Sequence, residues 1–352
     1  MKRLHRLSIR RRAEGGHRPA GKAGSRNSRS AATNWLAGEW AGSLGQVSRK
    51  KKKNENLPEG MTRRQAKLAK RAAERAALER DPRPFGGFAS EADLIAMQEF
   101  APSARAKIAV KGVDYPVYLV TVLPGATAAI VRDTDGDTPP TAFVALQCQH
   151  RGPNPHKDLA QTLAWLQTAQ PGQTLGTSIA DGTEPELSEL MDPTQKLDVQ
   201  VEKDFDWWLP EGQTIDPAMQ QNMKQVNESM LPTERIDVSA PGAVWWTDGG
   251  DKGYIRWIRQ DDEDALFTAL ARLYAAGDLT LGEGTRFAGA FRTHGVAVPV
   301  FDVDPTVTAQ EFQEPIQQLA VALEKALAVD TPLTADERKA RDTIRSRQVT
   351  IR

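Results

Sequence analysis

The stretch PGAVWWTDGGDKGYIRWIR, residues 241–259, decides the expected fold. A Pro-Gly-Ala turn leads into the apolar run VWWT, and the turn DGGD, residues 248–251, separates it from GYIRWIR. Two β-prone runs joined by a short Gly- and Asp-rich turn predict a β-hairpin. A helix with leucines at positions i, i+4 and i+7 is expected from Asp264 onward, and its apolar stripe should lie on the sheet.

A weaker copy of this pattern lies upstream, over residues 124–176. It contains PGA, the strand AAIVRD, an acidic turn, the strand TAFVALQCQ and a helix from Asp158. Further strands are expected at ARAKIAV, PVYLVTVL and LDVQVEKDFDWW, and after the second helix at RFAGAF and VAVPVFDV. The order predicts an α+β fold: two weakly similar strand–hairpin–helix repeats with antiparallel sheets, then C-terminal helices.

Five segments are expected along the chain. Residues 1–46 are interpreted as disordered, and on one hypothesis as translated upstream sequence preceding a true start at Val47. The others are a basic arm over residues 47–88 with a helix at 63–80 and a linker, repeat 1 at 89–235, repeat 2 with a C-terminal helix at 236–330, and a charged tail helix at 331–352. Capping boxes at Thr62/Gln65 and Thr334/Glu337 predict the starts of the arm helix and the tail helix.

The formal net charge of zero hides a split along the chain. Residues 1–80 hold 22 of the 46 basic and 6 of the 46 acidic residues, a net charge of +16, so residues 81–352 carry −16. Such asymmetry is typical of a basic tail for an anionic partner on an acidic body; the alternative is a tail that lies on its own body or is solvated. The residues expected to contact that partner are Arg49, Lys50, Lys51, Lys52, Lys53, Arg63, Arg64, Lys67, Lys70 and Arg71.

Candidate catalytic and metal sites are few. Cys148 and His150 would share a strand face, but no family signature surrounds them, and a structural thiol is the favoured interpretation. The acidic turn DTDGD, residues 133–137, fails the EF-hand pattern because its glycine is fourth rather than sixth, so a hairpin turn is favoured. We predict no catalytic residue, no metal and no cofactor.

Five of the eight tryptophans fall between residues 207 and 257. The adjacent pairs Trp207/Trp208 and Trp245/Trp246 would point to both faces of a sheet if they lie on strands. A two-sided core is the favoured interpretation. The alternative is a binding surface made of Trp245, Trp246, Arg256, Trp257 and Arg259.

The segments NENLPEGMTRRQAKLAKRAAERAALERDPRPFGGF, residues 54–88, and EADLIAMQEFAPSA, residues 91–104, resemble an uncharacterised actinobacterial family defined as a domain of unknown function. The resemblance is expected to extend from about Val47 to the end. Some relatives begin with a SEC-C zinc motif and carry a SecA-like label. That motif needs several closely spaced cysteines, and none precedes Cys148, so the resemblance implies neither the metal site nor a translocase role here.

These features favour a cytoplasmic, non-enzymatic binding protein. The arm would contact RNA or the ribosome through phosphates, because it lacks the interleaved aromatics that stack on bases, and the body would bind a protein partner. One alternative is an enzyme or small-ligand protein with a site between the repeats. Another, from the resemblance alone, is an accessory of preprotein translocation. No apolar run approaches the roughly 20 residues that span a bilayer.

Overall fold

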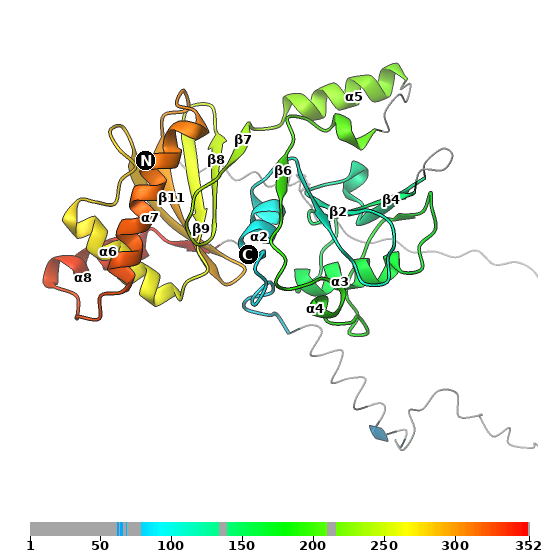
Figure 1. Ribbon diagram of the computed structural model, residues 1–352, viewed down its shortest axis with the longest axis horizontal. Coiled ribbons are helices and arrows are strands. Elements are labelled where there is room, and N and C mark those ends of the chain that lie inside the picture. Colours follow the sequence, from blue (N-terminus) through cyan, green and yellow to red (C-terminus); the bar gives the residue numbers. More distant parts are fainter. Residues whose placement is uncertain are drawn as a thin grey trace, which may run out of the picture. The chain divides into compact units, whose positions relative to one another are not determined.

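The computed structural model describes residues 62, 64, 65, 68, 79–133, 139–209 and 216–350. All of these lie in one compact unit, Leu57–Arg352. Within them the chain forms two six-stranded sheets with helices, which confirms the α+β class (Figure 1). None of the helices in this described part is both long and apolar enough to cross a membrane.

The first sheet has the strand order β5-β3-β4-β2-β1-β6. Neighbouring strands are antiparallel except β2 and β4, which run parallel. The strands are β1 (Ala104–Ile108), β2 (Val117–Val120), β3 (Ala129–Arg132), β4 (Thr141–Ala145), β5 (Thr174–Leu175) and β6 (Val199–Val201). The helical segments of this half are α2 (Glu91–Glu99), η1 (Pro124–Ala126), α3 (Pro155–Leu166), α4 (Leu187–Leu190) and η2 (Asp206–Trp208).

The second sheet has the order β12-β10-β11-β9-β8-β7, antiparallel except for the parallel pair β10 and β12. Helix α5 (Pro217–Glu228) precedes it. The strands are β7 (Thr233–Ile236), β8 (Ala243–Asp248), β9 (Gly253–Ile258), β10 (Arg286–Thr293), β11 (Val296–Val303) and β12 (Val349–Thr350). The helical segments are α6 (Glu263–Ala276), η3 (Ala309–Phe312), α7 (Gln313–Leu327) and α8 (Ala335–Ser346).

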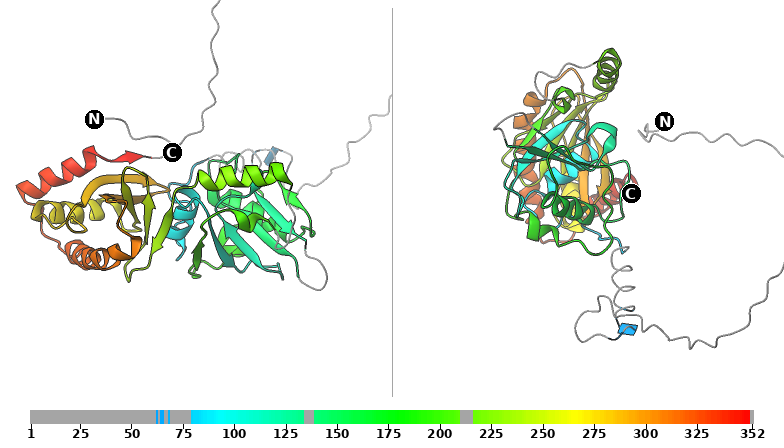
Figure 2. Two further views of the ribbon diagram at one scale, coloured as in Figure 1. Left: turned by 90° about the horizontal axis from the view of Figure 1, so that it is seen from above. Right: turned by 90° about the vertical axis from the view of Figure 1, so that its right-hand side faces the viewer.

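The hairpin quoted from residues 241–259 is β8–β9, and its turn pairs Asp248 with Gly253. Helix α6 follows, begun by the Asp262 side chain, which accepts a hydrogen bond from the Ala265 N–H, and ended by Gly277 at φ 83°. Helices α6, α7 and α8 gather on one face of this sheet (Figure 2). The charged tail helix buries Ala340 and Ile344 there, and its capping box at Thr334 and Glu337 is formed.

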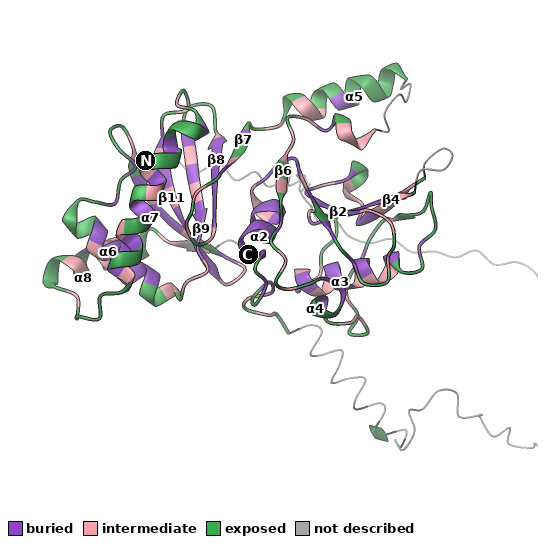
Figure 3. Cartoon of the chain, viewed as in Figure 1, coloured by how far each residue is buried: buried purple, intermediate pink, exposed green. Residues whose placement is uncertain are grey.

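The opposite face of the second sheet packs on α2. The sequence suggests that this helix has one apolar side, Leu94, Ile95 and Met97, yet every residue from Glu91 to Gln98 is buried (Figure 3). One core joins α2 with the first sheet and with residues of β8, β9 and β11. A helix of nine residues enclosed on all sides no longer needs the amphipathic pattern of a surface helix.

Several expectations need correction. Glu79 and Arg80 are not helical, so the helix expected at 63–80 does not include its last two residues, although the capping box of Thr62 and Gln65 is formed. The segment expected to be a linker packs on the body, with Phe85 fully buried. Trp207 and Trp208 lie in the short helical turn η2 rather than on a strand. The turn residues 134–138 lie outside the described residues.

The internal repeat is not confirmed by the strand order. Each sheet contains a hairpin followed by a helix, β3–β4 with α3 and β8–β9 with α6. In the first sheet, the next strand beyond β4 is β2, which precedes the hairpin in the chain and runs parallel to β4. In the second sheet, the next strand beyond β9 is β11, which follows the hairpin in the chain and runs antiparallel to β9. The shared hairpin–helix unit is therefore connected differently in the two sheets.

Candidate functional site

The residues predicted to contact an anionic partner lie almost entirely outside the described part of the chain. Arg64 is the exception, and it is exposed in the first turn after Thr62. The remaining predicted positions are Arg49, Lys50, Lys51, Lys52, Lys53, Arg63, Lys67, Lys70 and Arg71. What the structure does describe is the place where the arm joins the body.

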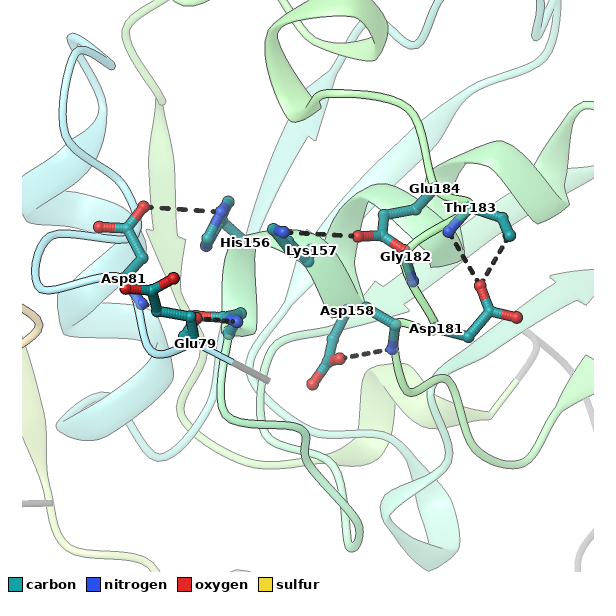
Figure 4. Close-up of polar contacts among 11 residues, drawn as sticks. Glu79, Asp81, His156, Lys157, Asp158, Asp181, Gly182, Thr183 and Glu184 are labelled. Atoms are coloured by element: carbon teal, nitrogen blue, oxygen red, sulfur yellow. Dashed lines mark hydrogen bonds and ion pairs between the residues drawn. The ribbon is translucent and has the colours of Figure 1, made fainter. Parts of the chain in front are cut away.

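Asn154 holds the end of the arm. Its side-chain amide donates to the carbonyl of Glu79 at 2.8 Å, and its Oδ1 accepts the N–H of Asp81 at 2.8 Å (Figure 4). Asn154 is also the N-cap of α3, but its side chain makes no capping bond there. Asn154 is 1% exposed. Its amide supplies one donor and one acceptor to the backbone of Glu79 and Asp81, as the backbone of a neighbouring strand would, and so holds this segment in place.

A histidine beside this contact faces the same segment. His156 Nε2 lies 3.7 Å from Asp81 Oδ2, and the side chain of His156 is largely buried. Burial lowers the pKa of His156, and the nearby Asp81 carboxylate opposes that shift only in part. The imidazole is therefore favoured in its neutral form, and the contact with Asp81 is a weak one.

Asp158, in the first turn of α3, ties two loops to the helix. Its Oδ2 accepts the N–H of Gly152 at 2.6 Å. Its Oδ1 accepts the N–H of Ala180 at 2.8 Å, and this bond is the dashed line at Asp158 in Figure 4. Burial raises the pKa of Asp158, and these two hydrogen bonds counter that effect. A Cβ at Gly152 would lie 2.7 Å from Asp158 Oδ1, so the loop approaches the carboxylate too closely for a side chain.

The segment after Asp81 is bound to both halves of the unit. Arg83 donates two hydrogen bonds of 2.7 Å to the carboxylate of Glu91, which is almost fully buried, and a third of 2.9 Å to the carbonyl of Gln260. Gln260 also donates to Glu91. Two parallel bonds from an arginine to a carboxylate form a strong and directional pair, so this contact holds the root of the arm firmly.

The tryptophan cluster is not the binding surface that one interpretation of the sequence suggests. Trp245 faces α2, and Trp246 and Trp257 face α6–α8, all 7% exposed or less, as expected of a two-sided core. Arg259 is fully buried, with Asp261 at 2.6 Å and Glu324 at 2.8 Å. Arg256 is partly buried, which lowers its pKa, and it donates to Thr247 Oγ1 at 2.8 Å.

Cys148 is placed as a structural thiol. It lies after the end of β4, packed against the apolar cluster of Val120 and Phe143, and burial raises its pKa. Its Sγ lies 3.4 Å from the carbonyl of Ala145, while His150 is exposed. A protonated thiol is a poor nucleophile. Over the ranges that the structure describes, no cluster of three His, Cys, Asp or Glu side chains is arranged to hold a metal ion.

One alternative from the sequence is a small-ligand site between the two repeats. The space between the two sheets is filled by α2 and its apolar neighbours. A shallow cavity of about 210 Å³ lies elsewhere, between the loop at Leu281–Thr285 and the start of α7.

Sequence reasoning missed the contacts of Asn154. The Asn154-Pro155 pair does signal a helix start, but the partners of its side chain lie more than 70 residues away.

The fold and this junction define an α+β protein in which two sheets enclose a buried helix and a basic segment joins the body through an asparagine clamp. A family model describes residues 84–352, and the chain belongs to that family, a family of unknown function (DUF5926). The matched region begins at residue 84, well after the Val47 expected from the resemblance. No curated protein and no solved structure matches the chain.

Proposed function

We propose that this protein binds RNA through its basic arm, residues 47–88, carried on an acidic body. The observation that supports this most is the charge split. The arm holds 13 basic and 5 acidic residues, a net charge of +8, while residues 89–352 hold 23 basic and 39 acidic residues, a net charge of −16. Neutralising phosphates with lysine and arginine releases counterions, which makes such binding favourable, salt-sensitive and indifferent to base sequence.

The junction supports the same proposal. Asn154, Glu91 and the carbonyl of Gln260 hold Glu79–Arg83 against the body, so the arm leaves the body at a defined point. A second contact made by the body near that point would act at high effective concentration once the arm is bound. The acidic body would also repel an anionic partner from other parts of its surface, which directs the partner to the arm.

The test is a salt series on the full chain with a fluorescein-labelled 20-nucleotide oligo(U). In the arm variant, Lys50, Lys51, Lys52 and Lys53 are each replaced by Gln. We expect at least tenfold weaker binding at low salt, and a slope of log K against log salt that is smaller by up to about 3, since each lost phosphate contact removes about 0.7.

The matched control removes the same charge from the body, with Gln at the exposed residues Lys111, Lys196, Lys325 and Lys339. Its affinity and slope should stay close to those of the unmodified protein. Equal losses in both variants would mean that only overall charge matters, and an unchanged arm variant would contradict the proposal.

A further inference from the structure

The first sheet has an outer face that differs from every other sheet face described. Its inner face packs on α2, while the register places Lys107, Tyr118, Phe143, Ile130 and Thr174 side by side on the outer face, across five strands. The only strand residue of this row that is buried is Phe143. The described cluster over this face is small: it consists of Val120, Leu123, Phe143 and Ala145 with Tyr118, Ile130, Cys148 and Trp207 against it.

Four aromatic rings form a continuous array on this face. Tyr118 and Phe143 stack with centroids 5.7 Å apart and planes at 19°. Trp207 lies 6.0 Å from Phe143, and Trp208 lies 6.3 Å from Trp207. We call Tyr118, Phe143, Trp207, Trp208 and the cations Lys107 and Arg132 the aromatic sheet face.

The array is held rigidly. Trp207 Nε1 donates to Ser103 Oγ and Trp208 Nε1 donates to the carbonyl of Val122, both at 3.0 Å. Arg132 lies 4.6 Å from the centre of the Phe143 ring and donates to the carbonyls of both tryptophans. Because the indole N–H groups are satisfied within the protein, the rings are pre-organised and need no rearrangement to accept a flat ligand.

The array is also accessible. Tyr118, Trp207 and Trp208 are each half-buried, unlike Trp245, Trp246 and Trp257 in the second sheet. Lys107 is exposed at one end of the row, and Arg132 is partly buried, with a pKa that burial lowers. Lys107 and Arg132 are two cations beside accessible rings, and this local arrangement favours a partner that is both flat and anionic.

We propose that the aromatic sheet face stacks the bases of single-stranded RNA, with Lys107 on the phosphates. Proteins that bind single strands commonly place bases on aromatic side chains of an open sheet beside basic groups, and every base offers a ring face. This inference rests on the proposed function, since it adds a base contact to the same partner. It assigns to the body the stacking that the basic stretch 49–80, which contains no aromatic residue, does not supply.

The test uses the full chain and the same labelled oligo(U), with Tyr118→Leu and the control Tyr274→Leu. Tyr274 is 37% exposed on α6, in the other half. Losing one stacked base should weaken binding about tenfold at every salt concentration, with an unchanged salt slope, because stacking releases no counterions. The control should bind as the unmodified protein does. If Tyr118→Leu binds oligo(U) with unchanged affinity, the inference is overturned, and a protein partner becomes the remaining explanation of this face.

A second variant keeps the test valid if Tyr118→Leu disturbs folding. Lys107 is exposed, so Lys107→Glu should fold normally, and it should weaken RNA binding at least threefold and lower the salt slope by about 0.7. Lys325→Glu, a substitution of an exposed lysine on α7, is its control. Lys107→Glu binding no more weakly than this control would count against the aromatic sheet face.

The two proposals fail in different ways. If the arm variant loses affinity and slope while Tyr118→Leu and Lys107→Glu bind normally, the arm proposal stands and the inference is overturned. If Tyr118→Leu loses affinity while the arm variant binds normally, the inference stands and the arm proposal is overturned. Absence of RNA binding by the unmodified chain overturns both.

Discussion

The two adjacent tryptophan pairs share the dipeptide Trp-Trp but have opposite surroundings. Trp245 and Trp246 lie on β8, between α2 on one face and α6–α8 on the other, and both are buried. Trp207 and Trp208 lie in the turn η2, against the outer face of the first sheet, and both are half-buried. A Trp-Trp pair therefore does not by itself indicate either a core or a surface, because burial depends on which elements cover each face.

The largest expected effect on stability comes from truncating a tryptophan of the buried pair. Trp245 is fully buried, so Trp245→Ala should lower the free energy of unfolding by about 3–5 kcal/mol. Trp208→Ala, at the half-buried pair, should cost about 1–2 kcal/mol, because neighbouring water can fill the space. Denaturant unfolding of the full chain measures both, and equal losses would contradict the assigned difference in covering.

The two Pro-Gly-Ala turns, residues 124–126 and 241–243, also share a sequence but differ in the space around their glycines. Gly242 has φ 88°, and a Cβ there would lie 1.9 Å from the carbonyl oxygen of Ile258, whereas Gly125 has φ 67° and its nearest contact would be 3.9 Å away. Gly125→Ala should cost about 1 kcal/mol for the backbone conformation alone. Gly242→Ala should cost about 3 kcal/mol, since the strand pair must also move apart. A smaller loss at Gly242 than at Gly125 would refute the close packing of the second turn.

The clamp on the arm should give a smaller and more local effect. Asn154→Ala leaves the Glu79 carbonyl and the Asp81 N–H without their side-chain partners and should cost about 1–3 kcal/mol. Hydrogen exchange of the Asp81 amide should become faster in this variant, while amides of β9 stay protected. Asn227→Ala, which removes a similar contact to Phe205 and Asp206, is the control and should leave Asp81 unaffected.

The smallest expected effect is on the pH dependence of stability. Burial lowers the pKa of His156 below its usual value near 6.5, so on acidification the unfolded chain binds a proton before the folded one does. Stability should therefore fall as the pH drops below about 6.5, by less than 1.4 kcal/mol per pH unit from this one group. His156→Gln should flatten the profile between pH 7.5 and 5.5, while the exposed control His150→Gln should not. A profile that His156→Gln leaves unchanged would show that this histidine is not the group responsible.

Local sequence predicted local structure well. The hairpin at residues 241–259, the capping box at Thr334 and Glu337 and the leucine stripe of α6 all involve residues within a few positions of each other, so their energies are readable from a short window. Short elements with weak patterns were missed: the two-residue strands β5 and β12, the edge strand β7 and the exposed helix α5.

The candidate sites depended on contacts that no short window contains. From the sequence, Asn154 is predicted to be a helix cap. Glu79 and Asp81 lie more than 70 residues from it in the chain, and only the fold brings them within hydrogen-bond distance of its side chain. The row Lys107–Tyr118–Phe143 needs the parallel pairing of β2 with β4, which hairpin reasoning does not predict.

By itself the sequence determined the strongly patterned strands and helices, the α+β class and the charge split, because propensity, periodicity and composition are properties of neighbouring residues. Only the tertiary structure decided that α2 is enclosed between two sheets, that one tryptophan pair is core and the other borders an open face, and where the arm is held. These outcomes depend on which distant surfaces meet, and burial of apolar area rewards many such pairings in similar measure, so a local pattern does not select among them.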